Sequence, residues 1–174
     1  ATSTSTLNFG NIRVGTSSTT LGVTASNVGP DHTKVKNLFV PAGTGDFSGG
    51  NQSFNPLFRD PTLGSDTASS SFSYTPSSRG ADTQNLSITS DSGSKSLALM
   101  GTGVGPVFDS VSTADFGTVA VGSPVALPFS VTNATSDGDL GALTNLTLVS
   151  AAIDGPDAAE FALVGFTPGL VLSA

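Results

Sequence analysis

A short segment near the start of the chain recurs in its second half, and this repeat constrains the fold more than any other feature. Residues 7–15 read LNFGNIRVG and residues 114–122 read ADFGTVAVG, with the Phe and both glycines in place. Three further blocks match in the same order: 21–27 with 127–133, 37–40 with 145–148, and 45–47 with 159–161. Loop insertions in a duplicated domain produce collinear blocks of this kind, so the sequence predicts two tandem copies of one module.

Within these blocks, apolar and hydroxyl-bearing side chains alternate with a period of two residues. Leu21, Val23 and Ala25 alternate with Thr and Ser, and the same pattern continues elsewhere: 72–74, 86–88, 97–99 and 129–131. This alternation is typical of strands with one buried face. Turn-forming residues separate the segments: 15–16, 28–31, 48–50, 60–61, 79–80, 91–93, 136–139 and 154–156. The pattern predicts an all-β chain of tandem immunoglobulin-like antiparallel β-sandwiches, with one helical turn at 156–161.

The composition fits an exported protein and argues against several partners. Only 11% of the residues are charged, so Ser, Thr, Asn and Gly must supply most of the surface polarity. All six basic residues precede residue 100, where six Asp balance them, and the remaining seven acidic residues account for the net charge of −7. We therefore expect neither nucleic acid nor an anionic membrane surface as a partner. The chain has no cysteine and no apolar run long enough to span a membrane.

The repeat places the domain boundary in a Gly-rich junction at 101–106. We expect a first domain at 1–103 and a second, incomplete one at 104–174, which lacks counterparts of 71–100. Such a sandwich would expose its apolar inner face and unpaired strand edges. Three interpretations remain open: the chain is a piece of a longer protein, strands from another molecule complete the second domain, or the second domain is a smaller fold.

These blocks together resemble the hydin-type immunoglobulin-like domains, also called ASH or choice-of-anchor D domains, which are similar to PapD and major sperm protein sandwiches. The opening motif of that family matches Phe9-Gly10, Val14-Gly15 and Asn27, and again Phe116-Gly117, Val121-Gly122 and Asn133. Its closing motif matches FSYTP at 72–76, LSITSD at 86–91 and LALMGTG at 97–103. Pro128 departs from the pattern and predicts an edge position or a bulge.

This resemblance implies a bacterial, exported, multi-domain protein built from such modules in series, often tethered to the cell envelope. The N-terminal run ATSTST looks like an end exposed when a signal peptide is removed. The family brings no catalytic residues and no cofactor to this chain, so neither is expected. The expected location is extracellular or at the cell surface.

The residues offer little chemistry of their own. The single histidine, His32, falls in a predicted turn, and no nucleophile elbow, phosphate loop or zinc motif is present. Asp137 and Asp139 are candidate calcium ligands, because calcium favours carboxylate and carbonyl oxygens in loops. Asp-Gly pairs are also ordinary turn residues, so a turn that binds no metal is the alternative interpretation of this segment.

The sequence therefore predicts a non-catalytic structural or adhesive module that acts as a spacer or a protein-interaction scaffold. Its expected partners are proteins or neighbouring copies of itself, bound through strand edges, and a homo-oligomer is one form this could take. Two alternatives stay open. One is a self-assembling subunit of an extracellular filament completed by strand donation, and the other is a calcium-dependent ligand-binding module.

Overall fold

The computed structural model describes residues 1–30, 32–59, 62 and 66–174 of the chain. It divides into two compact units, Ala1–Val104 and Gly105–Ala174, here called unit 1 and unit 2. The turns predicted at Asp31 and at Asp60-Pro61 lie outside the described residues.

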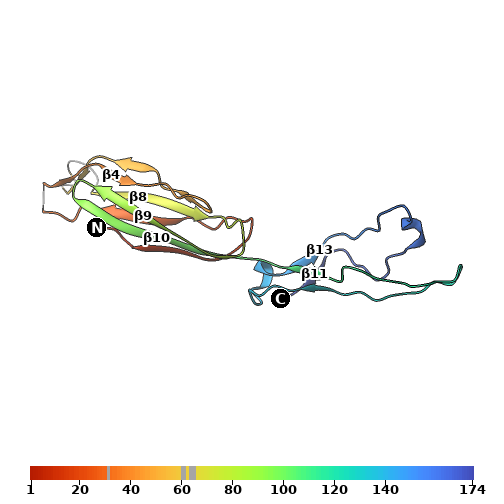
Figure 1. Cartoon of the computed structure of the whole chain (residues 1–174). Coiled ribbons are helices and arrows are strands. Elements are labelled where there is room, and N and C mark those ends of the chain that lie inside the picture. Colours follow the sequence, from red (N-terminus) through yellow and green to blue (C-terminus); the bar gives the residue numbers. More distant parts are fainter. Residues whose placement is uncertain (31, 60–61, 63–65) are drawn as a thin grey trace. The chain divides into compact units, whose positions relative to one another are not determined.

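The described residues form strands and two short 3-10 helices, and most of the regular structure lies in unit 1 (Figure 1). The strands of unit 1 are β1 (Thr6–Arg13), β2 (Leu21–Ser26), β3 (Lys34–Val35), β4 (Leu38–Val40), β5 (Phe47–Gly49), β6 (Gln52–Phe54), β7 (Leu57–Phe58), β8 (Thr67–Tyr74), β9 (Gly80–Ser90) and β10 (Gly93–Val104). The elements of unit 2 are β11 (Phe108–Ser110), β12 (Val131–Asn133), η1 (Gly141–Leu143), β13 (Leu146–Leu148), η2 (Ala158–Glu160) and β14 (Leu170–Leu172).

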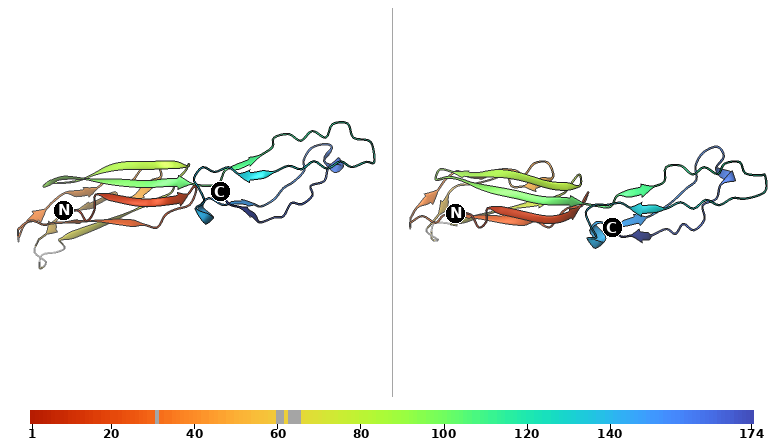
Figure 2. Two further views of the ribbon diagram at one scale, coloured as in Figure 1. Left: turned by 90° about the horizontal axis from the view of Figure 1, so that it is seen from below. Right: turned by 60° about the horizontal axis from the view of Figure 1, so that its bottom comes forward.

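Unit 1 is a sandwich of two sheets. One sheet has the strand order β1-β10-β9-β4-β6, and the facing sheet has the order β2-β8-β5, with β3 and β7 forming a small separate pair. Figure 2 shows β1, β10 and β9 side by side in one layer. The long β9–β10 hairpin pairs from Gly80–Gly103 to Ser90–Gly93 without a break in register. The immunoglobulin-like sandwich predicted from the period-two pattern is confirmed in this unit.

One strand pair runs parallel, whereas the sequence led us to expect only antiparallel pairs. β1 lies beside β10 with Leu7 opposite Leu99 and Arg13 opposite Val104, and both strands run in the same direction. Parallel neighbours need a long connection between them, and the intervening strands of unit 1 provide it. The ladder is interrupted between Asn8 and Asn11, where Gly10 has a φ of 69°. Glycine suits this bulge because its lack of a Cβ removes the steric penalty at positive φ.

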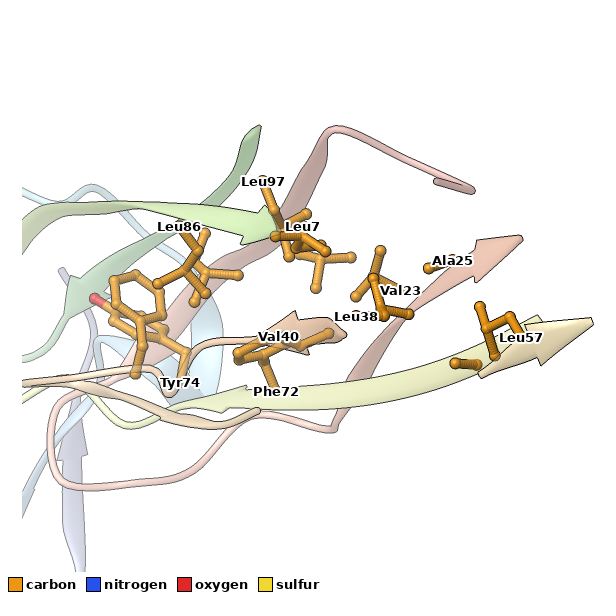
Figure 3. Close-up of a cluster of buried hydrophobic side chains, with 14 residues drawn as sticks. Leu7, Val23, Ala25, Leu38, Val40, Leu57, Phe72, Tyr74, Leu86 and Leu97 are labelled. Carbon is orange, nitrogen blue, oxygen red and sulfur yellow. The ribbon is translucent and has the colours of Figure 1, made fainter. Parts of the chain in front are cut away.

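The core of unit 1 forms where the two sheets face each other. In β8, Ala68, Ser70, Phe72 and Tyr74 are buried while the residues between them are more exposed, as the alternation predicted. These side chains meet inward-facing residues of the other strands: Leu7, Val23, Leu38, Val40, Phe47, Leu86, Ile88, Leu97 and Leu99 (Figure 3). β8, β9 and β10 supply about half of this cluster. The core therefore depends on the last third of the unit.

Tyr74 lies at the centre of an aromatic group at one end of this core. Its ring is fully buried, stacks on Phe47 with centroids 4.9 Å apart, and lies 6.0 Å from Phe9. A Cβ at Gly101 would lie 2.5 Å from the ring, so only glycine fits at that position of β10. The phenol oxygen donates a 2.6 Å hydrogen bond to Oδ2 of Asp82 on β9. Burial raises the pKa of Tyr74 well above its ordinary value, and the hydrogen bond and negative charge of Asp82 add to the effect.

Unit 2 has short strands and long connecting segments that belong to no sheet (Figure 1). β11 pairs with β12, and β13 pairs with β14, all antiparallel. Within 105–174, all of which the structure describes, no apolar side chain is buried, and Thr144 is the fully buried side chain. The alternation predicted a strand at 129–131, but β12 begins only at Val131, and the repeated segments 114–121 and 127–130 form no strand. The helical turn expected at 156–161 is present as η2.

The environment of Tyr74 predicts how unit 1 responds to alkali. Tyr74 is the only tyrosine, so phenolate absorbance reports it alone. Because the folded-state pKa is raised, the stability that the neutral phenol contributes is complete below about pH 10 and is lost as the pH rises further. We expect no phenolate signal near pH 10 in the folded protein, and a midpoint near 10 in denaturant.

The control is Tyr74→Phe, which should show no phenolate signal under either condition. A folded protein that titrates near pH 10 with an unchanged circular dichroism spectrum would contradict the buried, hydrogen-bonded phenol described above.

Candidate functional site

Positions matched by the sequence repeat have the same local geometry in the two units. Gly10 and Gly117 have φ angles of 69° and 62°, and Gly15 and Gly122 both have 79°. The amide of Gly10 donates to Oδ1 of Asn8 at 2.9 Å, and the amide of Gly117 donates to Oδ1 of Asp115 at 2.8 Å. The turns that the repeated motif encodes therefore form even where no strand flanks them.

An asparagine at the end of the second repeated block makes equivalent contacts in each unit. The side-chain amide of Asn27 donates to the carbonyl oxygens of Thr33 and Leu57, at 3.1 and 3.2 Å. That of Asn133 donates to the carbonyl oxygens of Thr144 and Leu172, at 2.8 and 3.2 Å. We call this arrangement the asparagine clamp, because one side chain ties together segments that are distant in sequence.

The asparagine clamp corrects one part of the sequence alignment. It matches Thr33 with Thr144, whereas the alignment of 37–40 with 145–148 would place Thr144 opposite Lys36. The sequence match followed the shared Asn-Leu pair, but the strand pairing follows the clamp: Val35 lies opposite Leu57, and Leu146 lies opposite Leu172. Leu172 thus corresponds to Leu57, which lies in β7, the strand that comes before β8 in unit 1.

Unit 2 exposes apolar side chains at positions where unit 1 buries them. Val23 is 2% exposed, whereas Phe129 at the matched position is 54% exposed. Phe47 is 4% exposed, and its match Phe161 is 50% exposed. We call the apolar residues of unit 2 at core-lining positions the open face: Phe116, Val119, Leu127, Phe129 and Phe161. Full burial of one such side chain stabilises a protein by about 1.5–3 kcal/mol, so the open face forgoes a large stabilisation.

Two rings of the open face are arranged like the matched rings of unit 1. The centroids of Phe9 and Phe47 lie 5.9 Å apart, and those of Phe116 and Phe161 lie 5.7 Å apart. In unit 1 the ring of Tyr74, from β8, joins this pair. The chain has no second tyrosine, so no such ring completes the group in unit 2.

Unit 2 also lacks backbone pairing in the segments that carry the open face. In unit 1, β1 pairs with β10, while β2 and β5 pair with β8. The matched segments of unit 2, around 113–120, 127–130 and 161–163, form no strands. Strands form in unit 2 only where both partners match segments that come before β8 in unit 1. These pairs are β11 with β12, and β13 with β14. Within 105–174, no strand takes the places of β8, β9 and β10, so the open face and the unpaired segments both lack the partners that these strands provide in unit 1.

The candidate calcium ligands both contact backbone amides of unit 2. Oδ2 of Asp137 accepts a 2.9 Å hydrogen bond from the amide of Gly105, and Oδ1 of Asp139 accepts one of 3.0 Å from Gly141. Among the described residues, no group of three or more His, Asp or Glu side chains gathers in a way that could hold a metal ion. The calcium hypothesis stays a prediction that rests on the sequence.

Other places in the molecule offer little for chemistry. His32 lies in an exposed turn with a φ of 64°. A hollow of about 120 Å³ in unit 1 is lined by Ala25, Val35, Leu57 and Lys95 among others. Pockets for small molecules usually measure roughly 300–1,000 Å³, so this hollow is too small for such a ligand. Among the described residues, no helix has the length and apolarity needed to cross a membrane.

Comparisons with known proteins find similarity among solved structures only. No protein-family model matches the chain, and no curated protein matches it. Among solved structures, the chain is similar to the ASH / PapD-like domain of human CEP192 (PapD-like domain 7). The identity is 15% and the TM-score is 0.44, over 59% of this chain and 83% of that one. The class of the protein, an immunoglobulin-like β-sandwich, rests on the strand order and core of unit 1.

The calcium hypothesis predicts a specific thermal response. If Asp137 and Asp139 bind calcium, the melting temperature rises in millimolar calcium and falls again when a chelator is added. A ligand at about 100 times its Kd adds about 2.7 kcal/mol to the stability of the folded state. Asp137→Asn and Asp139→Asn should each remove this rise, whereas Asp109→Asn, in the same unit, should keep it. Equal melting temperatures with calcium and with chelator would exclude the hypothesis.

Proposed function

We propose that this chain is a non-catalytic structural module of a bacterial secreted or cell-surface protein, where it acts as a spacer and protein-interaction scaffold. The observation that carries the proposal is the contrast between the units. Unit 1 buries its apolar core between two sheets, whereas unit 2 presents the open face and unpaired segments. Apolar surface and free strand edges of this kind are typical of sites where another polypeptide binds.

The surface chemistry supports an exported scaffold. Hydroxyl side chains pair across neighbouring strands of unit 1, as in Thr24 with Ser69 at 2.9 Å and Ser48 with Ser73 at 2.8 Å. A surface of this type keeps the protein polar with few charges, in line with the 11% of charged residues. A spacer needs a stable sandwich and no buried reactive group, and the chemistry described above suits that role.

Labelling of intact cells tests the proposed location. We expect an antibody raised against unit 1 to label cells that produce the natural protein without permeabilisation, or to detect the protein in the culture medium. An antibody against a cytoplasmic enzyme serves as the control and should label only permeabilised cells. Labelling that requires permeabilisation, with none of the protein in the medium, would contradict an exported module.

A second candidate function is a self-assembling subunit of an extracellular filament, and the open face of unit 2 favours it. Apolar surface that repeats on every copy can drive association, and a contact between different patches of two copies extends without closing. We expect such a subunit to sediment as larger species as its concentration rises and to form filaments visible by electron microscopy.

Phe161→Asp provides the matched test of assembly, because it adds a charge to the open face without removing a buried side chain. It should shift the sedimentation profile to the monomer. Asp substitution of Ser48, an exposed residue of unit 1, should leave assembly unchanged. A wild-type chain that remains monomeric at high concentration would rule out the filament.

A further inference from the structure

We propose that Asp154 of unit 2 is a site of spontaneous modification, at which its side-chain carboxyl group condenses with the amide nitrogen of Gly155 and then reopens to isoaspartate. The inference is independent of the function proposed above. It follows from a comparison of the two Asp-Gly pairs of the chain, Asp137-Gly138 and Asp154-Gly155, because their carboxyl groups have different hydrogen-bond partners.

The reaction needs only two neighbouring residues and water. The amide nitrogen of the residue after an aspartate attacks the carbon of the side-chain carboxyl group, and a C–N bond forms. Water leaves with the hydroxyl of the carboxylic acid and the proton of the amide, and the product is a succinimide ring. Water then adds to one of the two ring carbonyls and opens the ring again, to aspartate or to isoaspartate. Glycine hinders the ring least, because it has no Cβ.

The two reacting groups of the pair Asp154-Gly155 are in contact. The amide nitrogen of Gly155 lies 2.7 Å from Oδ1 of Asp154 and donates a hydrogen bond to it. The carbon that this nitrogen must attack is bonded to the same oxygen, so the side chain of Asp154 folds back over its own peptide group. Both residues are exposed, and water can therefore reach the ring carbonyls. Gly155 has a φ of 112°, a conformation that favours glycine.

The carboxylate of Asp137, by contrast, is held by an amide that is distant in sequence. Its Oδ2 accepts a 2.9 Å hydrogen bond from the amide of Gly105, 32 positions earlier. The hydroxyl of Thr135 supports this contact, because it donates to the carbonyl oxygen of Gly105 at 2.7 Å and accepts from the amide of Asp137 at 3.3 Å. A succinimide at Asp137 would remove the charged acceptor of the Gly105 amide. The folded chain therefore protects Asp137 and leaves Asp154 open to reaction.

The modification changes the path of the main chain but not its final charge. Isoaspartate keeps one carboxylate, while the main chain passes through the former side chain and gains a methylene group. At Asp154 this extra group lies shortly before η2 and Phe161. The ring of Phe161 lies 5.7 Å from that of Phe116, so the modified turn would alter how the chain reaches this pair.

Ageing of the folded chain tests the site. The full chain is kept at neutral pH and physiological temperature for several weeks, and isoaspartate is then measured by methyl transfer from S-adenosylmethionine with an isoaspartate-specific methyltransferase. An endoprotease that cuts before aspartate but not before isoaspartate gives the position. We expect about tenfold or more isoaspartate at residue 154 relative to residue 137, the factor that one hydrogen bond to a charged group provides.

Matched variants separate the effect of the fold from that of the sequence. Asp154→Glu keeps the carboxylate but requires a larger ring that closes far more slowly, so it should remove the methyl transfer assigned to residue 154. Gly105→Pro removes the amide that holds Asp137 and should raise isoaspartate there. Gly105→Ala keeps this amide, and its Cβ would meet no atom within 4 Å, so isoaspartate at residue 137 should stay low. In denaturant, the two Asp-Gly pairs should react at similar rates.

Two results would overturn the inference. One is a folded chain that forms no isoaspartate at residue 154, and the other is a folded chain in which residue 137 reacts as fast as residue 154 or faster. If circular dichroism shows that Gly105→Pro does not fold, the comparison of the folded wild type with the denatured wild type decides the question. A ratio of the two sites that is the same in both states would then show that the fold does not select Asp154.

Discussion

The strands β8, β9 and β10 provide both the hydrogen-bond partners and the apolar cover on which this fold depends. β8 holds β2 and β5 in one sheet, and β10 holds β1 in the other, so three of the four edge strands pair directly with one of these strands. The same strands carry Phe72, Tyr74, Leu97 and Leu99 into the core. Where no equivalents are present, as in unit 2, both the pairing and the burial are missing together. In this architecture, strand pairing and burial of the core therefore occur together.

The local features of the repeated motif are present in unit 2 as well, although strand pairing and core burial are missing there. The left-handed glycines and the side-chain bonds at Asn8 and Asp115 depend on residues close in sequence, and the asparagine clamp depends on segments that lie before the position of β8. They shape the turns of both units to the same geometry. Unit 2 thus keeps the geometry of its turns although its apolar side chains are exposed.

The period-two alternation predicted the central strands correctly, because one face of β2, β8, β9 and β10 is buried against the opposite sheet. It could not predict that β1 runs parallel to β10, since the alternation of a strand carries no information about the direction of its neighbour. It also predicted a strand at 129–131, where Phe129 and Ser130 lie outside β12 and have no strand beside them within the unit. The apolar side chains that unit 2 exposes lie at positions that the repeat matches to the core of unit 1. The role of Asn27 was not, because its contacts lie far along the chain; the signal was its place at the end of a repeated strand.

The parallel pairing of β1 and β10 has a mechanical consequence. The chain enters unit 1 through β1 and leaves it through β10, and the two strands lie side by side from Thr6 and Ala98 to Arg13 and Val104. Tension applied where the chain enters and leaves would pull these neighbours in opposite directions along their length. The ladder would then be loaded in shear, so its hydrogen bonds resist together instead of opening one at a time from an end. Such a geometry suits a link that must stay folded while the polypeptide is stretched.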